Sequence, residues 1–145
     1  DFGFADKVAF TGFIEDGVMN ALYKVSDVVA VPSRYEPFGV VALEAMAAET
    51  PVVVADTGGL SEIIEQEKDG IKVWPNHSES LSWGINRVLL DTGLADYIRK
   101  NAKEKIKNMY TWSVVSKNTN ELYGRISEEY KNADWKAVKF VSANQ

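Results

Sequence analysis

Residues 27–33 read Asp-Val-Val-Ala-Val-Pro-Ser, and residues 51–56 read Pro-Val-Val-Val-Ala-Asp. Both runs have the length of a strand and are apolar at nearly every internal position. An antiparallel strand with one face in water would alternate apolar and polar residues, and these two runs do not alternate. They therefore predict parallel strands that are covered by helices on both faces.

Two more apolar runs of this size lie at residues 8–14 and 70–75, and stretches with helical spacing separate the four runs, at residues 18–25, 38–48 and 60–65. Alternating strands and helices predict the α/β class, with a doubly wound, Rossmann-like, mainly parallel sheet of about four strands and flanking helices. Sheets of this kind usually have five or six strands. Four strands therefore fit either a complete small sheet or the rear half of a larger one.

The pattern changes after Pro75, where apolar residues at helical spacing predict three helices and no further strand. Ser78 and Ser80 are candidate caps for the first of these helices, and His77, the only histidine, is expected at the surface. Because 145 residues leave little room for two domains, we expect one domain. Its expected parts are a sheet portion at about 8–75, C-terminal helices at about 78–132 and a tail at 133–145.

Composition excludes several classes of protein. Cysteine is absent, which excludes a disulfide scaffold, a thiolate zinc site and a cysteine nucleophile. The 21 acidic and 16 basic residues give a net charge of −5, so we expect no binding to nucleic acid. No apolar run approaches the length of about 18 residues that a membrane span requires, so we expect no stable membrane insertion. Together these features favour a cytoplasmic protein.

Glu44 is the only charged residue in the apolar stretch 38–48, which as a helix apolar all round is predicted to be buried. A glutamate is almost never fully buried without a partner. Glu44 therefore lies at a solvent-facing edge, pairs with a distant arginine, or faces a polar ligand at the mouth of the sheet. Glu36 is predicted to lie in the loop before this helix, because Pro37 disfavours the helical conformation at Glu36. Its alternative role is to cap the helix.

Three predicted strands end in loops that suit a ligand, and ligands of doubly wound sheets bind at the carboxyl ends of the strands. Gly39 would let a ligand approach the backbone, and the helix after it offers N–H groups to an anion. The pair Gly58-Gly59, after the next strand, either points its N–H groups at phosphate oxygens or forms a plain turn. Phe13, beside Gly12, either stacks on a base or packs in the core.

At these residues the sequence resembles a known family. Pro32-Ser33, Glu36-Pro37-Phe38-Gly39 with Glu44, and Thr57-Gly58-Gly59 are similar to the donor-binding domain of retaining glycosyltransferases with two Rossmann-like domains, the GT-B fold. Within that type the chain most resembles family 4, which includes glycogen and glucan synthases, sucrose synthases and mannosyltransferases. The likeness runs from about residue 8 to residue 130.

The resemblance implies a role for each matching residue. Glu44 would accept hydrogen bonds from the ribose of a nucleotide-sugar donor such as UDP- or ADP-glucose. Glu36, as the catalytic residue, would contact hydroxyls of the donor sugar and help to place the anomeric carbon. The other substrate-binding positions would lie near the sugar, the diphosphate, the acceptor side or the base; they are Gly12, Phe13, Arg34, Phe38, Gly39, Val40, Thr57, Gly58 and Gly59. The leaving phosphate would help to deprotonate the acceptor, without a cofactor or a metal, which fits the absence of an Asp-x-Asp motif.

The chain also departs from the family pattern. The family holds the diphosphate with an arginine and a lysine upstream of the first strand, and binds the acceptor sugar or glucan with an N-terminal domain. Residues 1–145 contain neither segment, and Arg34 is the only basic residue in the motif region. Since the chain also lacks a starting Met, we expect a hexosyltransferase donor domain truncated at its N-terminal side. Such a piece would be inactive alone, with exposed strand edges that invite self-association.

Two other interpretations stay open. The chain is either a non-catalytic Rossmann-like scaffold that binds donor weakly or not at all, or a domain similar to sugar-nucleotide epimerases. The second alternative calls for a different arrangement of acidic residues and histidine than the one present here.

Overall fold

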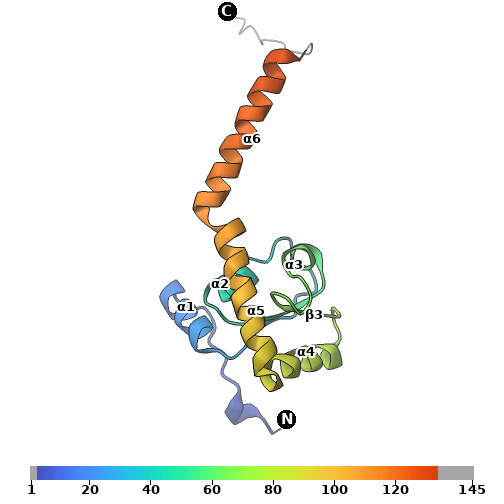
Figure 1. Ribbon diagram of the computed structural model, residues 1–145. Coiled ribbons are helices and arrows are strands. Elements are labelled where there is room, and N and C mark those ends of the chain that lie inside the picture. Colours follow the sequence, from blue (N-terminus) through green and yellow to red (C-terminus); the bar gives the residue numbers. More distant parts are fainter. Residues whose placement is uncertain (1–2, 134–145) are drawn as a thin grey trace, which may run out of the picture. The chain divides into compact units, whose positions relative to one another are not determined.

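The computed structural model describes residues 3–133, which form two compact units divided between Lys107 and Asn108. Figure 1 colours the elements along the chain. The first unit contains a 3-10 helix (Ala5–Lys7), α1 (Asp16–Val25), β1 (Val29–Val31), α2 (Val40–Ala47), β2 (Val52–Ala55), α3 (Gly58–Ile63), β3 (Ile71–Val73), α4 (Ser78–Leu90) and α5 (Thr92–Lys105). A π-helical turn (Ile106–Tyr110) follows α5, and α6 (Trp112–Asn132) belongs to the second unit. The predicted tail, apart from Ala133, lies outside the described residues.

The three strands form one parallel sheet in the order β1-β2-β3. Val29 is in register with Val52, and Val53 with Ile71. The predicted α/β class, the parallel pairing, the flanking helices and the helical C-terminus are therefore confirmed.

The sheet has three strands rather than about four, because the predicted strand at residues 8–14 is absent. A strand persists only where its backbone N–H and C=O groups pair with a neighbouring strand. Among the described residues no strand pairs with this segment, and the side chains of Phe10 and Phe13 are 96% and 98% exposed. Apolar composition alone could not produce the ladder that a strand needs.

Strand β2 is buried as predicted, whereas β1 is not covered on both faces, because Ala30 is exposed and Val29 is half-buried. Val52, Val53 and Val54 have no exposed surface, and one side of the sheet packs against Val88 of α4 and Ile98 of α5. Gly84 permits this contact, since a Cβ at that position would lie 2.6 Å from a side-chain carbon of Val73 and 2.8 Å from one of Val53. The helix therefore packs directly on the strands.

Helix α2 is less buried than its composition predicts. It begins at Val40 rather than Phe38, and buries only Ala42, Ala45 and Met46. Val40 and Val41 are 53% and 43% exposed. The prediction of a helix buried all round is wrong for the described chain, because α2 packs on the sheet and on α1 and α5 and leaves a further face to solvent.

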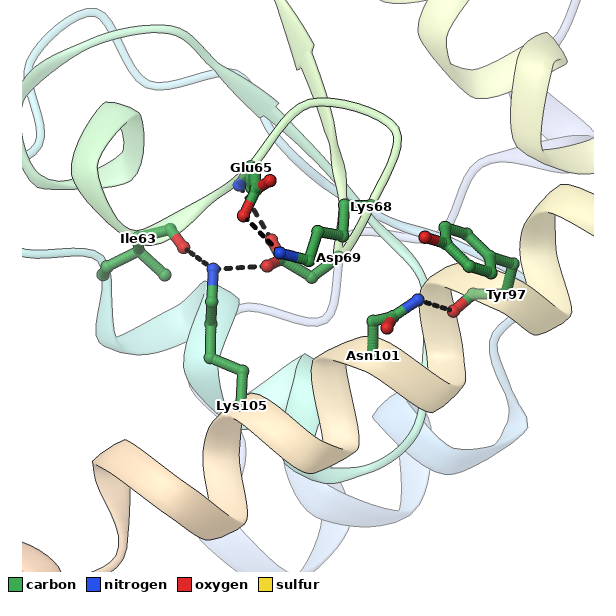
Figure 2. A network of polar contacts seen from close by, with 7 residues as sticks. All are labelled: Ile63, Glu65, Lys68, Asp69, Tyr97, Asn101 and Lys105. Atoms are coloured by element: carbon green, nitrogen blue, oxygen red, sulfur yellow. Dashed lines mark hydrogen bonds and ion pairs between the residues drawn. The ribbon is translucent and has the colours of Figure 1, made fainter.

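A buried ion pair fastens α5 at the amino edge of the sheet (Figure 2). Asp69 is 1% exposed, and its Oδ1 accepts a hydrogen bond of 2.8 Å from the Glu65 N–H. Its Oδ2 pairs with the Lys105 ammonium, which also donates to the Ile63 carbonyl over 2.6 Å. Asp69 precedes β3, so α5 is anchored on the side of the sheet opposite to the loops that were expected to bind ligand.

Side chains cap α4 and α5, but not those expected for α4. The cap of α4 is His77, whose Nδ1 accepts a hydrogen bond of 3.2 Å from the Ser80 N–H; His77 is exposed, as expected. The cap of α5 is Asp91, which accepts from the Leu94 N–H over 2.9 Å. This hydrogen bond is the main reason that the pKa of Asp91 is lowered, and the hydrogen bond from the Arg87 guanidinium is the second.

Within residues 3–133, no helix is both long and apolar enough to cross a membrane.

Candidate functional site

The two loops that follow β1 and β2 are joined to each other at the carboxyl edge of the sheet. The Gly59 N–H donates a hydrogen bond of 2.9 Å to the Glu36 carbonyl. The Thr57 hydroxyl donates to the Arg34 carbonyl over 3.5 Å. The structure therefore brings together four of the residues that the sequence selected, from two segments about twenty residues apart in the chain.

The glycine pair is explained by this contact. A Cβ on Gly58 would lie 2.1 Å from the Glu36 carbonyl oxygen, and one on Gly59 would lie 2.3 Å from that of Phe38. No side chain fits at such distances from backbone atoms. Gly58 also has a φ of 49°, which glycine adopts without strain. Packing between the two loops thus requires glycine at both positions, and the Gly59 amide is engaged within the chain.

Glu36 lies in the loop before α2, as predicted. Its side chain is half-buried, and its Oε2 accepts a hydrogen bond of 3.4 Å from the Ser33 hydroxyl. Glu36 does not cap the helix: the cap position is Gly39, and among the described residues no side-chain cap hydrogen bond is formed there. Its carboxylate therefore accepts a hydrogen bond from Ser33 and is not used as a cap by α2.

The start of α2 depends on Gly39. Its φ is 105°, and a Cβ there would lie 2.7 Å from a terminal carbon of Leu60. The amides of the first helical turn, at Val40 and Val41, have no acceptor one turn earlier in the helix. They carry the positive end of the helix dipole, so this turn suits an anionic group.

Glu44 lies one turn further along α2 and is exposed. Its Oε2 accepts a hydrogen bond of 3.2 Å from the Tyr23 hydroxyl of α1. Tyr23 is only 7% exposed. Burial, followed by the charge of Glu44, raises the pKa of Tyr23 above its ordinary value. Of the three alternatives for Glu44, a solvent-facing position agrees with its exposure, and its side-chain partner is a tyrosine instead of a distant arginine.

Tyr23 is the site residue that the sequence alone did not reveal. It has an unremarkable position in an amphipathic helix, and its partner is 21 residues away. Identifying the pair from the sequence would have required information that α1 and α2 lie next to each other.

Gly12 and Phe13 lie in an irregular segment, where Gly12 has a φ of 62° and its carbonyl accepts from the Thr11 hydroxyl over 3.2 Å. Phe13 is 98% exposed, so it is not a core residue in the described chain. The hydrogen bonds and ion pairs recorded for residues 3–133 include none from Gly12 or Phe13 to the other two loops. Within the same residues, no three His, Cys, Asp or Glu side chains are grouped so that they could hold a metal ion.

Residues 1–105 match the family model described as glycosyl transferases group 1. The chain therefore belongs to this family of glycosyltransferases. Its fold is that of GT-B glycosyltransferase structures, which it resembles at 33% sequence identity or more in several cases.

Known relatives support this assignment. The chain is 50% identical over 121 residues to an uncharacterized glycosyltransferase of Methanocaldococcus jannaschii, a match that covers 83% of this chain and 31% of the relative. It is 33% identical over 114 residues to glycogen synthase of Mycobacterium tuberculosis, covering 79% of this chain and 28% of that enzyme. The crystal structure of Anabaena HepE in complex with UDP and glucose matches with a TM-score of 0.76 and 33% identity, covering 86% of this chain and 33% of HepE. The chain thus spans about a third of the length of these relatives.

Proposed function

We propose that the chain of 145 residues is the donor-binding part of a retaining glycosyltransferase of family 4. The proposed reaction transfers a hexose, glucose in the first instance, from a nucleoside diphosphate sugar to an acceptor such as a glucan. The observation that carries the proposal is the packing of the β1–α2 loop on Gly58 and Gly59, which fixes the backbone of Glu36 in the loop before α2. The relation to glycogen synthase and the UDP and glucose bound by HepE support the choice of donor and acceptor.

Glu44 has the chemistry of a ribose ligand. An ionised carboxylate accepts hydrogen bonds from two neighbouring hydroxyls, and charge-assisted bonds of this kind are roughly twice as strong as neutral ones. Glu44 is exposed, while the hydroxyl of the buried residue Tyr23 donates to one of its oxygens. We infer that Tyr23 orients the carboxylate for the ribose.

Glu36 and the start of α2 have the chemistry of a sugar and diphosphate site. In the proposed reaction the bond between the anomeric carbon and the leaving phosphate oxygen breaks, and the acceptor oxygen bonds to that carbon on the same face. The acceptor proton passes to the leaving phosphate. Glu36 accepts hydrogen bonds from donor-sugar hydroxyls, and the first-turn amides of α2 face the diphosphate.

Departure of the diphosphate requires positive groups that stabilise its charge. Arg34, an exposed residue, is the one basic side chain of the β1–α2 loop. We therefore propose that the chain of 145 residues binds donor but does not transfer sugar by itself. Robust transfer by this chain alone would overturn that part of the proposal.

The non-catalytic scaffold is the second candidate function, and the single basic side chain in the loop favours it. An epimerase-like function has less support, because the only histidine, His77, caps α4 with one of its ring nitrogens.

Calorimetric titration with UDP-, ADP- and GDP-glucose separates the two candidates. We expect one of these donors to bind, and Glu44→Gln to weaken it by about tenfold or more, since a hydrogen bond to a charged group contributes roughly 1.5–3 kcal/mol. Glu104→Gln, an exposed glutamate on α5, is the matched control and should bind like the parent chain. If none of the three donors binds, or if Glu44→Gln binds as tightly as the parent, the donor-site proposal fails and the scaffold is favoured.

A further inference from the structure

We propose that a groove along the outer edge of β3 binds a neutral oligosaccharide, at a site separate from the proposed donor site. This β3-edge groove has a volume of about 420 Å³ and is lined by Asp56, Gln66, Lys72, Val73, Trp74, Ser80 and Trp83. Its volume is within the range of about 300–1,000 Å³ that is usual for small-molecule sites. None of the residues proposed to contact the donor lines it.

The edge of β3 is already closed by side chains. Strand β3 is the last in the sheet, so alternate backbone N–H groups point away from β2. The Lys72 N–H donates to the Gln66 side-chain oxygen, and the Trp74 N–H donates to the Ser80 hydroxyl over 3.0 Å. An added strand from another protein would have to displace both bonds, which disfavours a peptide as the occupant.

Two tryptophan side chains supply the recognition surface. Trp74 follows β3 and is 72% exposed, while Trp83 on α4 is 48% exposed, and both line the same groove. An indole ring has a large apolar face and a polar N–H at its rim. A pyranose ring likewise has an apolar face of C–H groups and a rim of hydroxyls, so it can stack on an indole and donate or accept hydrogen bonds around it.

The charges of the groove favour a neutral ligand. Asp56 and Lys72 form an ion pair of 3.5 Å, with side chains 40% and 25% exposed. Their charges cancel, and the Asp56 carboxylate would repel a phosphate. The carboxylate can accept bonds from sugar hydroxyls and the ammonium can donate to them, while the Gln66 NH₂ group provides a further donor.

Trp74 also connects the groove to the carboxyl edge of the sheet. A second hollow of about 330 Å³ shares Val73 and Trp74 with the groove and extends to Arg34 and His77. A glycan in the groove would therefore lie beside the loop that carries the proposed donor site. Binding in the groove itself does not depend on the proposed transferase function.

The test uses the 145-residue chain with maltoheptaose, cellohexaose and mannohexaose as probes, measured by saturation-transfer NMR and calorimetry. We expect at least one probe to bind, and Trp74→Ala and Trp83→Ala each to weaken it by about tenfold. Trp112→Ala is the matched control, because Trp112 is 88% exposed on α6 and lies outside the groove, and it should leave binding unchanged. Trp83→Phe keeps an aromatic face and should retain most of the affinity, which covers the case in which Trp83→Ala fails to fold.

Further results would separate this proposal from the donor site. Glu44→Gln should bind the oligosaccharide normally, and Trp74→Ala should bind the nucleotide sugar normally. The groove proposal is overturned if no probe binds at about 10 mM, or if Trp74→Ala binds as well as the parent. It is equally overturned if Trp112→Ala loses as much affinity as the groove variants.

Discussion

At the scale of single residues, one hydrogen bond joins Tyr23 to Glu44 of the proposed donor site. The Tyr23 ring is buried between α1 and its neighbours, and only its hydroxyl reaches the exposed carboxylate of α2. The buried Thr50 hydroxyl donates to the Tyr23 carbonyl, which ties the same residue to the segment before β2. Tyr23 is thus held by two bonds to different parts of the chain, and in the proposed donor site it would position Glu44.

Tyr23→Phe should lower donor affinity several-fold while costing no more than about 1 kcal/mol of stability, because it removes one hydrogen bond and keeps the ring. Calorimetry and urea denaturation measure the two effects. An unchanged donor affinity would show that Tyr23 does not orient Glu44.

The raised pKa of Tyr23 predicts a loss of stability in alkaline solution. The unfolded chain releases the phenol proton near pH 10, whereas the folded chain holds it to a higher pH, so stability present below about pH 10 is lost as the pH rises through the folded pKa. Denaturation at several pH values between about 8 and 11 should show a steeper alkaline decline for the parent than for Tyr23→Phe. Parallel declines in the two proteins would contradict the assignment.

At the scale of elements, the contact between the β1–α2 loop and the start of α3 predicts opposite effects for two glycine substitutions. Gly59→Ala should destabilise the fold by roughly 1–3 kcal/mol and weaken donor binding, because its Cβ would push the Phe38 carbonyl away. Gly124→Ala, on exposed α6 with nothing near its Cβ, should stabilise by about 1 kcal/mol through helix propensity. Thermal denaturation distinguishes them; equal effects would mean that helix propensity alone governs both positions.

The Asp69–Lys105 pair predicts a strong link between α5 and the segment before β3. Asp69→Asn should cost about 3 kcal/mol, since it leaves the largely buried Lys105 ammonium without its counter-charge. Lys105→Met should also destabilise, and the double variant should cost less than the sum of the two single changes. Lys68→Met, which breaks only an exposed pair with Glu65, is the control and should change stability little. If urea denaturation shows that the double variant loses as much stability as the two single variants added together, the pair is not coupled.

At the scale of the whole molecule, exposed apolar side chains predict self-association of the isolated chain. Phe10, Phe13, Val40 and Val41 are between 43% and 98% exposed in the first unit. Large exposed apolar surface usually marks an interaction site. Light scattering after size-exclusion chromatography should show an apparent mass that rises with concentration, and Phe10→Ser with Phe13→Ser should reduce that rise. The control is Leu90→Ser, which changes one residue of α4 that is 83% exposed and should leave the rise in apparent mass as it is in the parent chain. A monomer at every concentration would contradict the prediction.

Most of the strands and helices were predictable from local patterns, but the number of strands and the burial of α2 were not. Val52–Val54 are buried as their unbroken apolar run predicts, and α6 ends at Asn132, where the predicted C-terminal helices, at about 78–132, also end. The strand predicted from the apolar run at residues 8–14 is absent, because a strand depends on a partner that its own residues do not specify. Helix α2 is likewise partly exposed although its residues are almost all apolar, because the elements that pack against it determine which of its faces is buried.

The sequence by itself determined the parallel strands, the helices between them and the position of Glu36 in a loop with Glu44 inside the next helix. These features follow from side-chain periodicity and from the restriction that Pro37 places on its neighbour, which act over a few residues. Only the tertiary structure decided that Gly58 and Gly59 pack against the Glu36 loop, that Tyr23 holds Glu44, and that Lys105 neutralises Asp69. Each of those contacts joins residues some twenty or more positions apart, where the chain's path through space and not its local pattern sets the partner.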